Sequence, residues 1–311
     1  MKIHRFASVA ISVAALSVAA LLFADATSDW KTGLLAWRTH REQRLSAPDG
    51  WLTLVGLEWL KPGANTIGSA PDNRIRLSAA APAHLGVIEV SGSDIRLSAP
   101  AGGFAAGAQL DGAPAQAAKL ADDEAQKPSV INTGTLTILL LHRGDRYALR
   151  IKDSQAATRL NFHGLHWYEP DARYRVEARW VPCVPVKKIK VPSIIGVTDE
   201  MAAPGEAEFT LDGKTFQLEP VLEEPDAKQL FFILRDTTSR TTSYGAARFL
   251  YTDFPDHDGM RGLDQPGYLT LDFNRLQNPP CAYTAYATCP LPPEQNRVAI
   301  ALPVGEAKYS N

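Results

Sequence analysis

The sequence lacks the features by which several classes of protein are recognised. It contains 32 basic and 34 acidic residues, a formal net charge of −2, and no long basic stretch, which disfavours nucleic acid as a partner. No glycine-rich phosphate loop follows a predicted strand and opens a helix, which disfavours nucleotide chemistry. We therefore predict no nucleic-acid partner and no cofactor.

The sequence also lacks a recognised metal-binding spacing, although metal-ligating residue types are present. His163 and His166 stand three residues apart. A second group is rich in carboxylates: Asp253, Asp256, His257, Asp258 and Asp264. An EF-hand there would need a ligand at 260 and a glycine at 261, where Met260 and Arg261 stand. No metal site is predicted.

A complete catalytic motif is missing as well. The segment Thr241-Thr242-Ser243-Tyr244-Gly245 contains the Ser-x-Gly half of a nucleophile elbow but lacks the first glycine. It also lies between β segments, whereas the elbow needs a turn from a strand into a helix. The sequence therefore identifies no catalytic residue.

The one long apolar run of the chain stands near its N-terminus. Lys2 and Arg5 precede the run at 6–23, and Ala24-Asp25-Ala26 supplies small residues at the positions that signal peptidase reads. An anchor that is never cleaved is the alternative, but the run is at the lower length limit for a bilayer. We expect residues 1–26 to be a signal peptide. The mature protein is then periplasmic or secreted, without stable membrane insertion.

Export bears on the three cysteines, because thiols that meet outside the cytoplasm tend to oxidise. None of them lies near the cleavage site, which argues against a lipid-anchored form. Cys281 and Cys289 stand eight residues apart in a proline-rich segment that cannot be helical throughout, so a bridge is feasible. We expect a Cys281–Cys289 disulfide and a free, buried Cys183. A reactive thiol is the alternative.

The mature sequence begins with one predicted helix within residues 27–49. Four apolar residues fall on one helical face: Trp30, Leu34, Trp37 and Leu45. Arg41 and Glu42 are expected to lie off that face, and Pro48-Asp49-Gly50 ends the pattern. We interpret this segment as a packing helix without a ligand role.

From residue 51 onward, short β segments alternate with turn residues. Strands are predicted at 65–68, 74–77, 86–90, 93–97, 135–142 and 146–152, and then at 174–181, 186–190, 206–211, 214–218, 229–235, 246–251, 267–272 and 297–302. Hairpin turns are expected at Arg143-Gly144-Asp145 and at Asp212-Gly213. The predicted fold class is all-β: a β-sandwich over 50–153, then a second antiparallel β domain over 154–311.

The first β part resembles a forkhead-associated domain. GANTIG at 63–68, NRIRL at 73–77 and HLGVI at 84–88 follow the order of turn, strand and His-led strand in that family. The resemblance implies a β-sandwich. Family members bind phosphothreonine with an arginine that is replaced here by Ser69, and no serine shortly precedes His84. The cation that would pair with phosphate is missing, so phosphopeptide binding is not expected.

A second resemblance covers nearly the whole mature chain. The sequence resembles the bacterial family catalogued as domain of unknown function 1684. The segments that carry the resemblance are GWLTL at 50–54, Trp59-Leu60, SYGAARFL at 243–250, DFN at 272–274, NPPCAY at 278–283 and CPLPPEQNR at 289–297. It implies an exported or envelope protein without an assigned reaction.

The most unusual segment is 272–297, which we call the Pro/Cys loop. It contains five prolines and two cysteines among many polar side chains. Proline removes hydrogen-bond donors, so the segment cannot stay in a sheet, and its backbone groups need other partners. Two interpretations remain open. The polar side chains either satisfy the backbone of the loop or are presented to a ligand by a rigid loop.

Arg248 lies in a mostly apolar predicted strand and needs Asp236 or Asp272 as a partner, unless it awaits an anionic ligand. The predicted ligand-binding residues are Tyr244, Arg248, Asp272, Asn274, Asn278, Tyr283 and Asn296. The leading hypothesis is an exported protein that binds a small polar or anionic ligand. The alternatives are an envelope hydrolase that uses Asp272, His163 or a metal, and an interaction protein that docks through its N-terminal sandwich.

Overall fold

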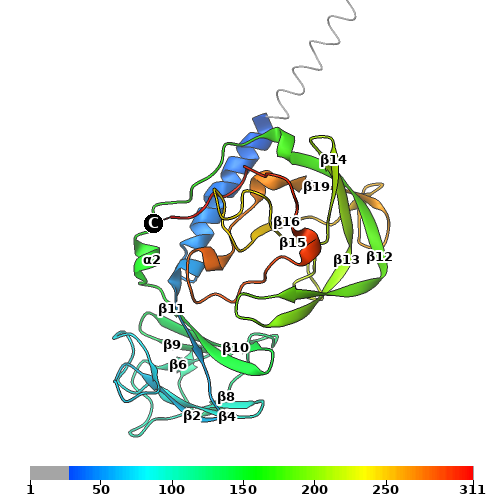
Figure 1. Ribbon diagram of the computed structural model, residues 1–311. Coiled ribbons are helices and arrows are strands. Elements are labelled where there is room, and N and C mark those ends of the chain that lie inside the picture. Colours follow the sequence, from blue (N-terminus) through cyan, green and yellow to red (C-terminus); the bar gives the residue numbers. More distant parts are fainter. Residues whose placement is uncertain (1–27, 311) are drawn as a thin grey trace, which may run out of the picture.

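A computed structural model describes residues 28–310 of the chain. The expected signal peptide at 1–26 lies outside the described residues. The described chain is mostly β, as the sequence predicts, with one long helix at 28–45 followed by antiparallel sheets (Figure 1). In this part of the chain no helix has the length and apolar character needed to cross a membrane.

The N-terminal β part consists of two sheets that face each other. One sheet has the strand order β1-β11-β10-β9-β6-β7 and the other β3-β2-β4-β5-β8. The strands are β1 (Leu54–Trp59), β2 (Gly63–Gly68), β3 (Ile75–Arg76), β4 (Gly86–Ser91), β5 (Asp94–Ser98), β6 (Gln109–Leu110), β7 (Ala113–Pro114), β8 (Ala118–Lys119), β9 (Val130–Thr133), β10 (Leu136–Arg143) and β11 (Arg146–Asp153). Alternate residues of both sheets, such as Ile88 and Leu149, fill the core between them.

The turn between β10 and β11 follows the sequence prediction. Arg143 pairs with Arg146 across the hairpin, which leaves a two-residue turn. Gly144 in this turn has φ +64°, a conformation that glycine adopts without steric cost. The turn fixes the register of β11, and with it the face on which Arg150 lies.

The C-terminal part has a sheet of order β14-β13-β12-β19-β17-β18 and a separate hairpin β15–β16. The strands are β12 (Arg175–Pro192), β13 (Thr198–Leu211), β14 (Lys214–Leu218), β15 (Leu230–Leu234), β16 (Arg248–Thr252), β17 (Asp256–His257), β18 (Met260–Arg261) and β19 (Gly267–Asp272). Short helices are α2 (Ala157–Leu160) and the 3-10 turns Trp51–Thr53, Ala172–Tyr174, Phe273–Arg275, Pro280–Ala282 and Glu294–Asn296. The long strands β12 and β13 curve around the hairpin (Figure 1).

Strand β15 is buried on both faces, which explains why its sequence is an unbroken apolar run. Leu230, Phe232 and Leu234 pack into the main core of the C-terminal part. Phe231 and Ile233 point the other way, into a second core that also contains Leu54 of β1. The hairpin therefore links the core of the C-terminal part to the start of the sandwich.

Two strand predictions are corrected by the structure. The segments 174–181 and 186–190 belong to one long strand, β12, whose pairing with β13 shifts register between Pro182 and Lys187. Residues 297–302 form no strand, although Arg297 makes a single bridge to Arg235. The backbone N–H of Leu302 donates to Asp236, and its carbonyl accepts from Arg248. Val298 and Ile300 bond to the backbone of Arg235 and Thr237, so this segment runs beside 235–237, and the side chains of Asp236 and Arg248 take over at Leu302.

The helix at 28–45 packs along the C-terminal part (Figure 1), and its polar residues take part in that packing. Arg41 Nε lies 2.9 Å from Glu306 Oε1, and Glu42 Oε1 accepts from Trp167 Nε1 at 2.8 Å. Arg38 donates to the carbonyl of Tyr168 at 2.9 Å. The expectation that Arg41 and Glu42 face away is wrong, because the surface under the helix contains a buried carboxylate and an indole N–H.

Candidate functional site

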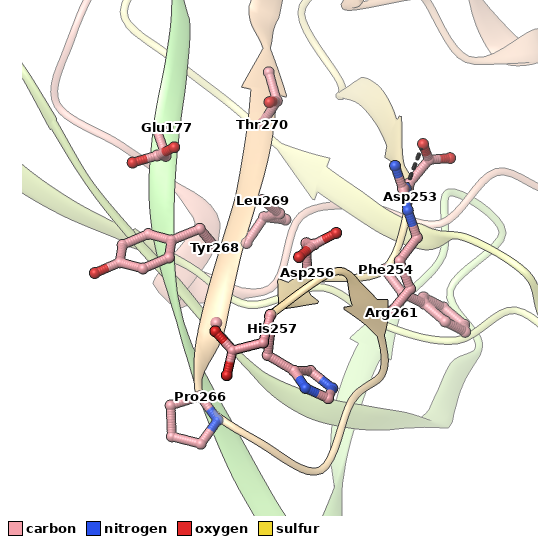
Figure 2. A pocket seen from close by; sticks show the side chains of 12 residues that line it. Glu177, Asp253, Phe254, Asp256, His257, Arg261, Pro266, Tyr268, Leu269 and Thr270 are labelled. Carbon is pink, nitrogen blue, oxygen red and sulfur yellow. Dashed lines mark ion pairs between the residues drawn. The ribbon is translucent and has the colours of Figure 1, made fainter.

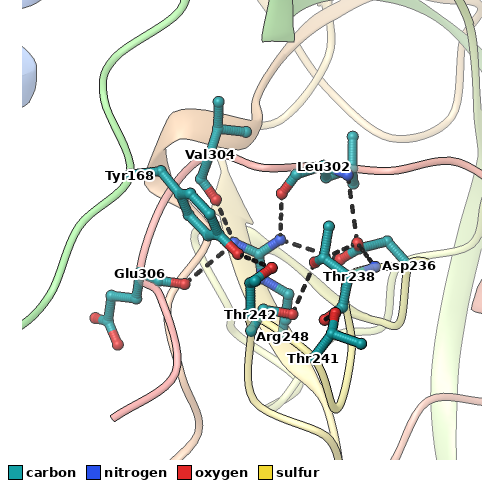
Figure 3. Close-up of polar contacts among 10 residues, drawn as sticks. Tyr168, Asp236, Thr238, Thr241, Thr242, Arg248, Leu302, Val304 and Glu306 are labelled. Atoms are coloured by element: carbon teal, nitrogen blue, oxygen red, sulfur yellow. Dashed lines mark hydrogen bonds and ion pairs between the residues drawn. The ribbon is translucent and has the colours of Figure 1, made fainter. Parts of the chain in front are cut away.

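Arg248, the central residue of the sequence-predicted site, is fully buried, and its two terminal nitrogens bind groups of the protein itself, whereas its Nε has no acceptor among residues 28–310. Its Nη1 lies 3.0 Å from Asp236 Oδ2 and donates to the Leu302 carbonyl at 2.7 Å. Its Nη2 donates to the carbonyls of Val304 and Glu306 (Figure 3). Of the two interpretations of Arg248, the contacts support the structural ion pair.

The three asparagines of the predicted site serve backbone groups of the chain. Asn274 exchanges hydrogen bonds with the backbone of Asp171 at 2.8 and 2.9 Å. Asn296 does the same with the backbone of Glu219, both at 2.8 Å, and Asn278 Nδ2 donates to the Ala307 carbonyl at 2.8 Å. These side-chain amides satisfy backbone N–H and carbonyl groups of segments that pack against the Pro/Cys loop.

The remaining predicted residues are engaged in the same way. Asp272 accepts from Trp30 Nε1 at 2.8 Å and from the backbone of Asn274. Tyr283 donates to the buried Glu306 at 2.5 Å, and burial followed by the Glu306 charge raises its pKa well above the usual value. Tyr244 donates to the carbonyl of Cys281 at 2.8 Å. The buried polar side chains of the Pro/Cys loop therefore form hydrogen bonds within the protein and stabilise the fold.

The outer side of the Pro/Cys loop borders a cleft of about 300 Å³ between the sandwich and the C-terminal part. Its walls come from the helix, from strands β10 and β11, from the hairpin β15–β16 with the segment before it, and from the loop. The lining residues are Arg41, Trp51, Arg143, Arg150, Glu223, Phe231, Phe249, Tyr251, Gln277, Asn278, Pro280, Thr288, Cys289 and Pro290. We refer to this region as the interdomain cleft.

Arg150 is the cation of the interdomain cleft that has no carboxylate partner among residues 28–310. Its Nη2 donates to Thr288 Oγ1 at 3.3 Å, and its guanidinium lies 5.2 Å from the centre of the Trp51 ring. Its Nε is buried and meets no acceptor in the described chain. Burial, followed by the nearby charge of Arg143, lowers the pKa of Arg150 to about 10. The charge is partly desolvated, and the carboxylate that favours it from a distance, Asp123, is already paired with Arg143.

The other two arginines of the cleft are already paired. Arg143 forms a bidentate pair with Asp123, with N–O distances of 3.0 and 2.7 Å. Arg41 binds Glu306 and also donates to the carbonyl of Asn278 at 3.0 Å. Although burial opposes its charge, Glu306 raises the pKa of Arg41 above the ordinary value. Of the three guanidinium groups, only Arg150 is open to an external anion.

Glu223 is a carboxylate at the rim of the same cleft. Tyr251 donates to its Oε1 at 3.4 Å, and no basic side chain of the described residues forms an ion pair with it. Partial desolvation raises the pKa of Glu223, the hydrogen bond from Tyr251 opposes this shift, and the Glu224 charge adds to it. The side chain of Glu223 is exposed at this rim, so its carboxylate is accessible to a cationic group of a ligand.

An aromatic wall accompanies these charged groups. The Phe231 and Tyr251 rings are stacked, with centres 4.7 Å apart and planes 9° apart. Phe249 meets Phe231 edge-on at 4.8 Å. All three rings line the cleft, but Phe231 and Phe249 are only 2% and 6% exposed, so the partly exposed Tyr251 ring forms the accessible part of this wall.

The two loop cysteines lie beside each other at the cleft and are free thiols in this structure. The Cys281 backbone N–H donates to Cys289 Sγ at 3.2 Å. A hydrogen bond from Cys289 lowers the pKa of the Cys281 thiol, whereas the pKa of Cys289 is raised by the same contact and by burial. The expected disulfide stays a prediction. Cys183 is partly exposed, with Sγ 3.4 Å from the Pro185 carbonyl, so its expected burial is wrong.

A second hollow, of about 540 Å³, lies over strands β17, β18 and β19 (Figure 2). It gathers part of the acidic group noted in the sequence, including Asp253, Asp256 and His257. Asp253 is paired with Arg261 at 2.5 Å, and both side chains are more than half exposed. Within residues 28–310, no three His, Cys, Asp or Glu side chains are grouped as a metal site would need. The hollow has no buried, unpaired group to bind a ligand.

Sequence reasoning found one wall of the interdomain cleft and missed the others. The Pro/Cys loop contributes Asn278, Thr288 and Cys289. Arg150 and Glu223 belong to segments more than 70 residues apart in sequence, and each reads as an ordinary surface charge. The only local signal for Arg150 is its place in β11, where Leu149 and Ile151 on either side of it are buried.

Comparison with known proteins supports the second sequence resemblance. The model of the family described as "Protein of unknown function (DUF1684)" matches residues 160–307. An uncharacterised protein from Haloarcula marismortui is 32% identical over 48% of this chain and 78% of that chain, with a TM-score of 0.40. No curated protein matches.

Two forkhead-associated domain structures also match, each at 22% identity and a TM-score of 0.22. One, from work on phosphothreonine-dependent interactions, covers 32% of this chain and 96% of that domain. The other, the FhaA domain complexed with an intracellular domain, covers 31% of this chain and 97% of that domain.

Proposed function

The chain belongs to the DUF1684 family, a family of unknown function, and from the geometry of its interdomain cleft we propose that it binds a small anion there. The acid group of the ligand pairs with the guanidinium of Arg150, beside the Thr288 hydroxyl. The Pro/Cys loop thus keeps a proposed ligand-binding role. The part proposed to contact the ligand is its outer side, at Thr288, and no longer its buried amides.

The observation that carries the proposal is that the guanidinium of Arg150 is partly desolvated and has no ion-pair partner among residues 28–310. A guanidinium that loses water without gaining a carboxylate raises the free energy of the folded protein. A charge-assisted hydrogen bond to an acid group stabilises such a group by about 1.5–3 kcal/mol. Arg248 shows the contrasting case, since a carboxylate of this chain, that of Asp236, pairs with its guanidinium.

Isothermal titration with inorganic phosphate and with benzoate tests the proposal. The informative variant is Arg150→Gln, and Arg146→Gln is the matched control. Arg146 lies on the same strand but outside the cleft, with its guanidinium 4.0 Å from the Trp59 ring centre. We expect one of the two anions to bind wild type and Arg146→Gln alike, and the Arg150→Gln variant to bind at least about tenfold more weakly. Equal affinity in all three proteins would refute the site.

We further propose that the protein is exported, with residues 1–26 removed. The support is the sequence pattern of a signal peptide. N-terminal sequencing of the protein from a fractionated bacterial culture is expected to begin at Thr27 in the periplasmic or secreted fraction. Recovery of the uncleaved chain from the cytoplasm alone would contradict export.

A further inference from the structure

Most charged side chains of the interdomain cleft are paired within the protein, and two of opposite sign are not. Glu306 neutralises Arg41, and Asp123 neutralises Arg143. Among the described residues this leaves one guanidinium, that of Arg150, and one carboxylate, that of Glu223, without an ion pair. Both groups line the same cleft. The cleft therefore offers one unpaired charge of each sign.

A buried hydrogen-bond acceptor lies in the same lining. Asn278 is 1% exposed, and its Oδ1 has no partner within residues 28–310, because its Nδ2 donates to Ala307 and the side chain is held in that direction. A buried carbonyl oxygen without a donor costs free energy in the folded protein. The Asn278 amide is thus a second unsatisfied polar group of the cleft lining, besides the guanidinium of Arg150.

The body of the ligand has to lie against apolar surface. The partly exposed rings of Trp51 and Tyr251, the second stacked on the buried Phe231 ring, offer flat surface in a space of about 300 Å³. Such a volume suits a ligand of about the size of an amino acid or a small substituted ring. A long polymer would not be enclosed by it.

We propose that the cleft takes a small zwitterion, in which an acid group and an ammonium group are joined by a short apolar or aromatic body. The acid group binds Arg150, the ammonium group faces Glu223, and the apolar body lies on the ring wall. This inference rests on the proposed anion-binding function and specifies its ligand class.

The two unpaired charges also act against the wrong ligands. A purely anionic ligand adds a like charge beside Glu223. A purely cationic ligand does the same to Arg150. Selectivity of this kind comes from the repulsive element as well as the attractive one, and only a ligand with both charges avoids both penalties.

Matched pairs of probes test the inference by isothermal titration. The zwitterions phenylalanine and 4-(aminomethyl)benzoate differ in the span between their charges. Their counterparts without the ammonium group are 3-phenylpropionate and 4-methylbenzoate. We expect at least one zwitterion to bind tenfold or more tightly than its counterpart. Glu223→Gln is expected to remove this preference, and the control Glu224→Gln, on the neighbouring residue outside the cleft lining, to keep it.

The outcomes separate the inference from the function on which it rests. If the acid-only probes bind as tightly as the zwitterions and Arg150→Gln abolishes their binding, the ligand class is wrong and the anion site stands. If no zwitterion binds while phosphate binds in an Arg150-dependent way, the result is the same. If Arg150→Gln changes the binding of no probe and of no phosphate, the anion site itself is refuted.

Discussion

At the scale of single residues, Arg150 and Arg248 show two environments of a guanidinium removed from water. Arg248 has Asp236 and three backbone carbonyls around it. Arg150 has one hydroxyl and an aromatic ring. The same side chain is thus part of the fold in one place and available to a ligand in the other, and stability measurements can distinguish the two.

Replacing Arg248 with Met leaves Asp236 buried without a cation. Breaking a buried ion pair from one side typically costs about 3–5 kcal/mol, so we expect the free energy of unfolding in urea to fall by about that much. The control Arg261→Met breaks the exposed pair with Asp253 and is expected to cost less than about 1 kcal/mol. Similar small losses in both variants would show that Arg248 does not hold the C-terminal segment.

Replacing Arg150 with Met is expected to act in the opposite direction. The pKa of Arg150 is lowered in the folded protein, so its charged form costs folding free energy at neutral pH, and this cost declines only as the pH rises from the lowered pKa toward the pKa of the unfolded chain. A neutral side chain removes the cost at every pH. We expect Tm at pH 7 to rise by about 1–3 °C, together with loss of anion binding. A fall of several degrees would mean that Arg150 is a structural residue.

Glu223 makes zwitterion binding depend on pH. Desolvation raises its pKa, so its negative charge is lost at a higher pH than that of an ordinary glutamate as the pH falls. Two titratable neighbours also affect the pKa of Glu223: the hydrogen bond from Tyr251 lowers it and the charge of Glu224 raises it. Arg143 is a further charged residue of the cleft lining. Affinity for a zwitterion is expected to drop on mild acidification in wild type and to stay flat in Glu223→Gln. A drop of equal size in both would assign the titration to another group.

At the scale of elements, the Pro/Cys loop could be anticipated from its composition, and its detailed role could not. Its prolines predict a segment that leaves the sheet, and Asn274 and Asn296 do satisfy backbone groups. The sequence does not reveal which backbone groups those are, because Asp171 and Glu219 are distant along the chain. The absent strand at 297–302 has a related cause, since Leu302 bonds to the distant side chains of Asp236 and Arg248 instead of extending the backbone contacts that Val298 and Ile300 make with 235–237.

The proximity of Cys281 and Cys289 makes the loop sensitive to oxidation. The Cys281 N–H already contacts Cys289 Sγ, and oxidation of two adjacent thiols to a disulfide by an extracytoplasmic oxidant releases two protons and two electrons. Protein purified from an oxidising compartment is expected to contain this bridge in peptide mass spectrometry without reduction, with Cys183 alkylated. Its reduction is expected to lower stability by about 2 kcal/mol. Free Cys281 and Cys289 in such protein would contradict the bridge.

At the scale of the whole molecule, the all-β class and most strands follow from periodicity, because alternation and turn residues are local signals. The interdomain cleft does not follow from them. It exists only where Arg41 of the helix, Arg150 of the sandwich, Glu223 and Cys289 meet. No local sequence pattern predicts that these four residues lie together. The polar residues of the helix could not be placed from the sequence either, because Arg41 pairs with Glu306, which is far away along the chain.

The most direct test of the account observes the side-chain N–H of Arg150 by nuclear magnetic resonance, with Arg150→Gln used for assignment. Titration with the tightest probe, zwitterionic or purely acidic, is expected to shift the Arg150 Nε–H signal and slow its exchange with water, while the Arg146 signal stays in place. If binding saturates and Arg150 keeps its signal unchanged, its unpaired guanidinium is not the anion site, and the central claim is wrong.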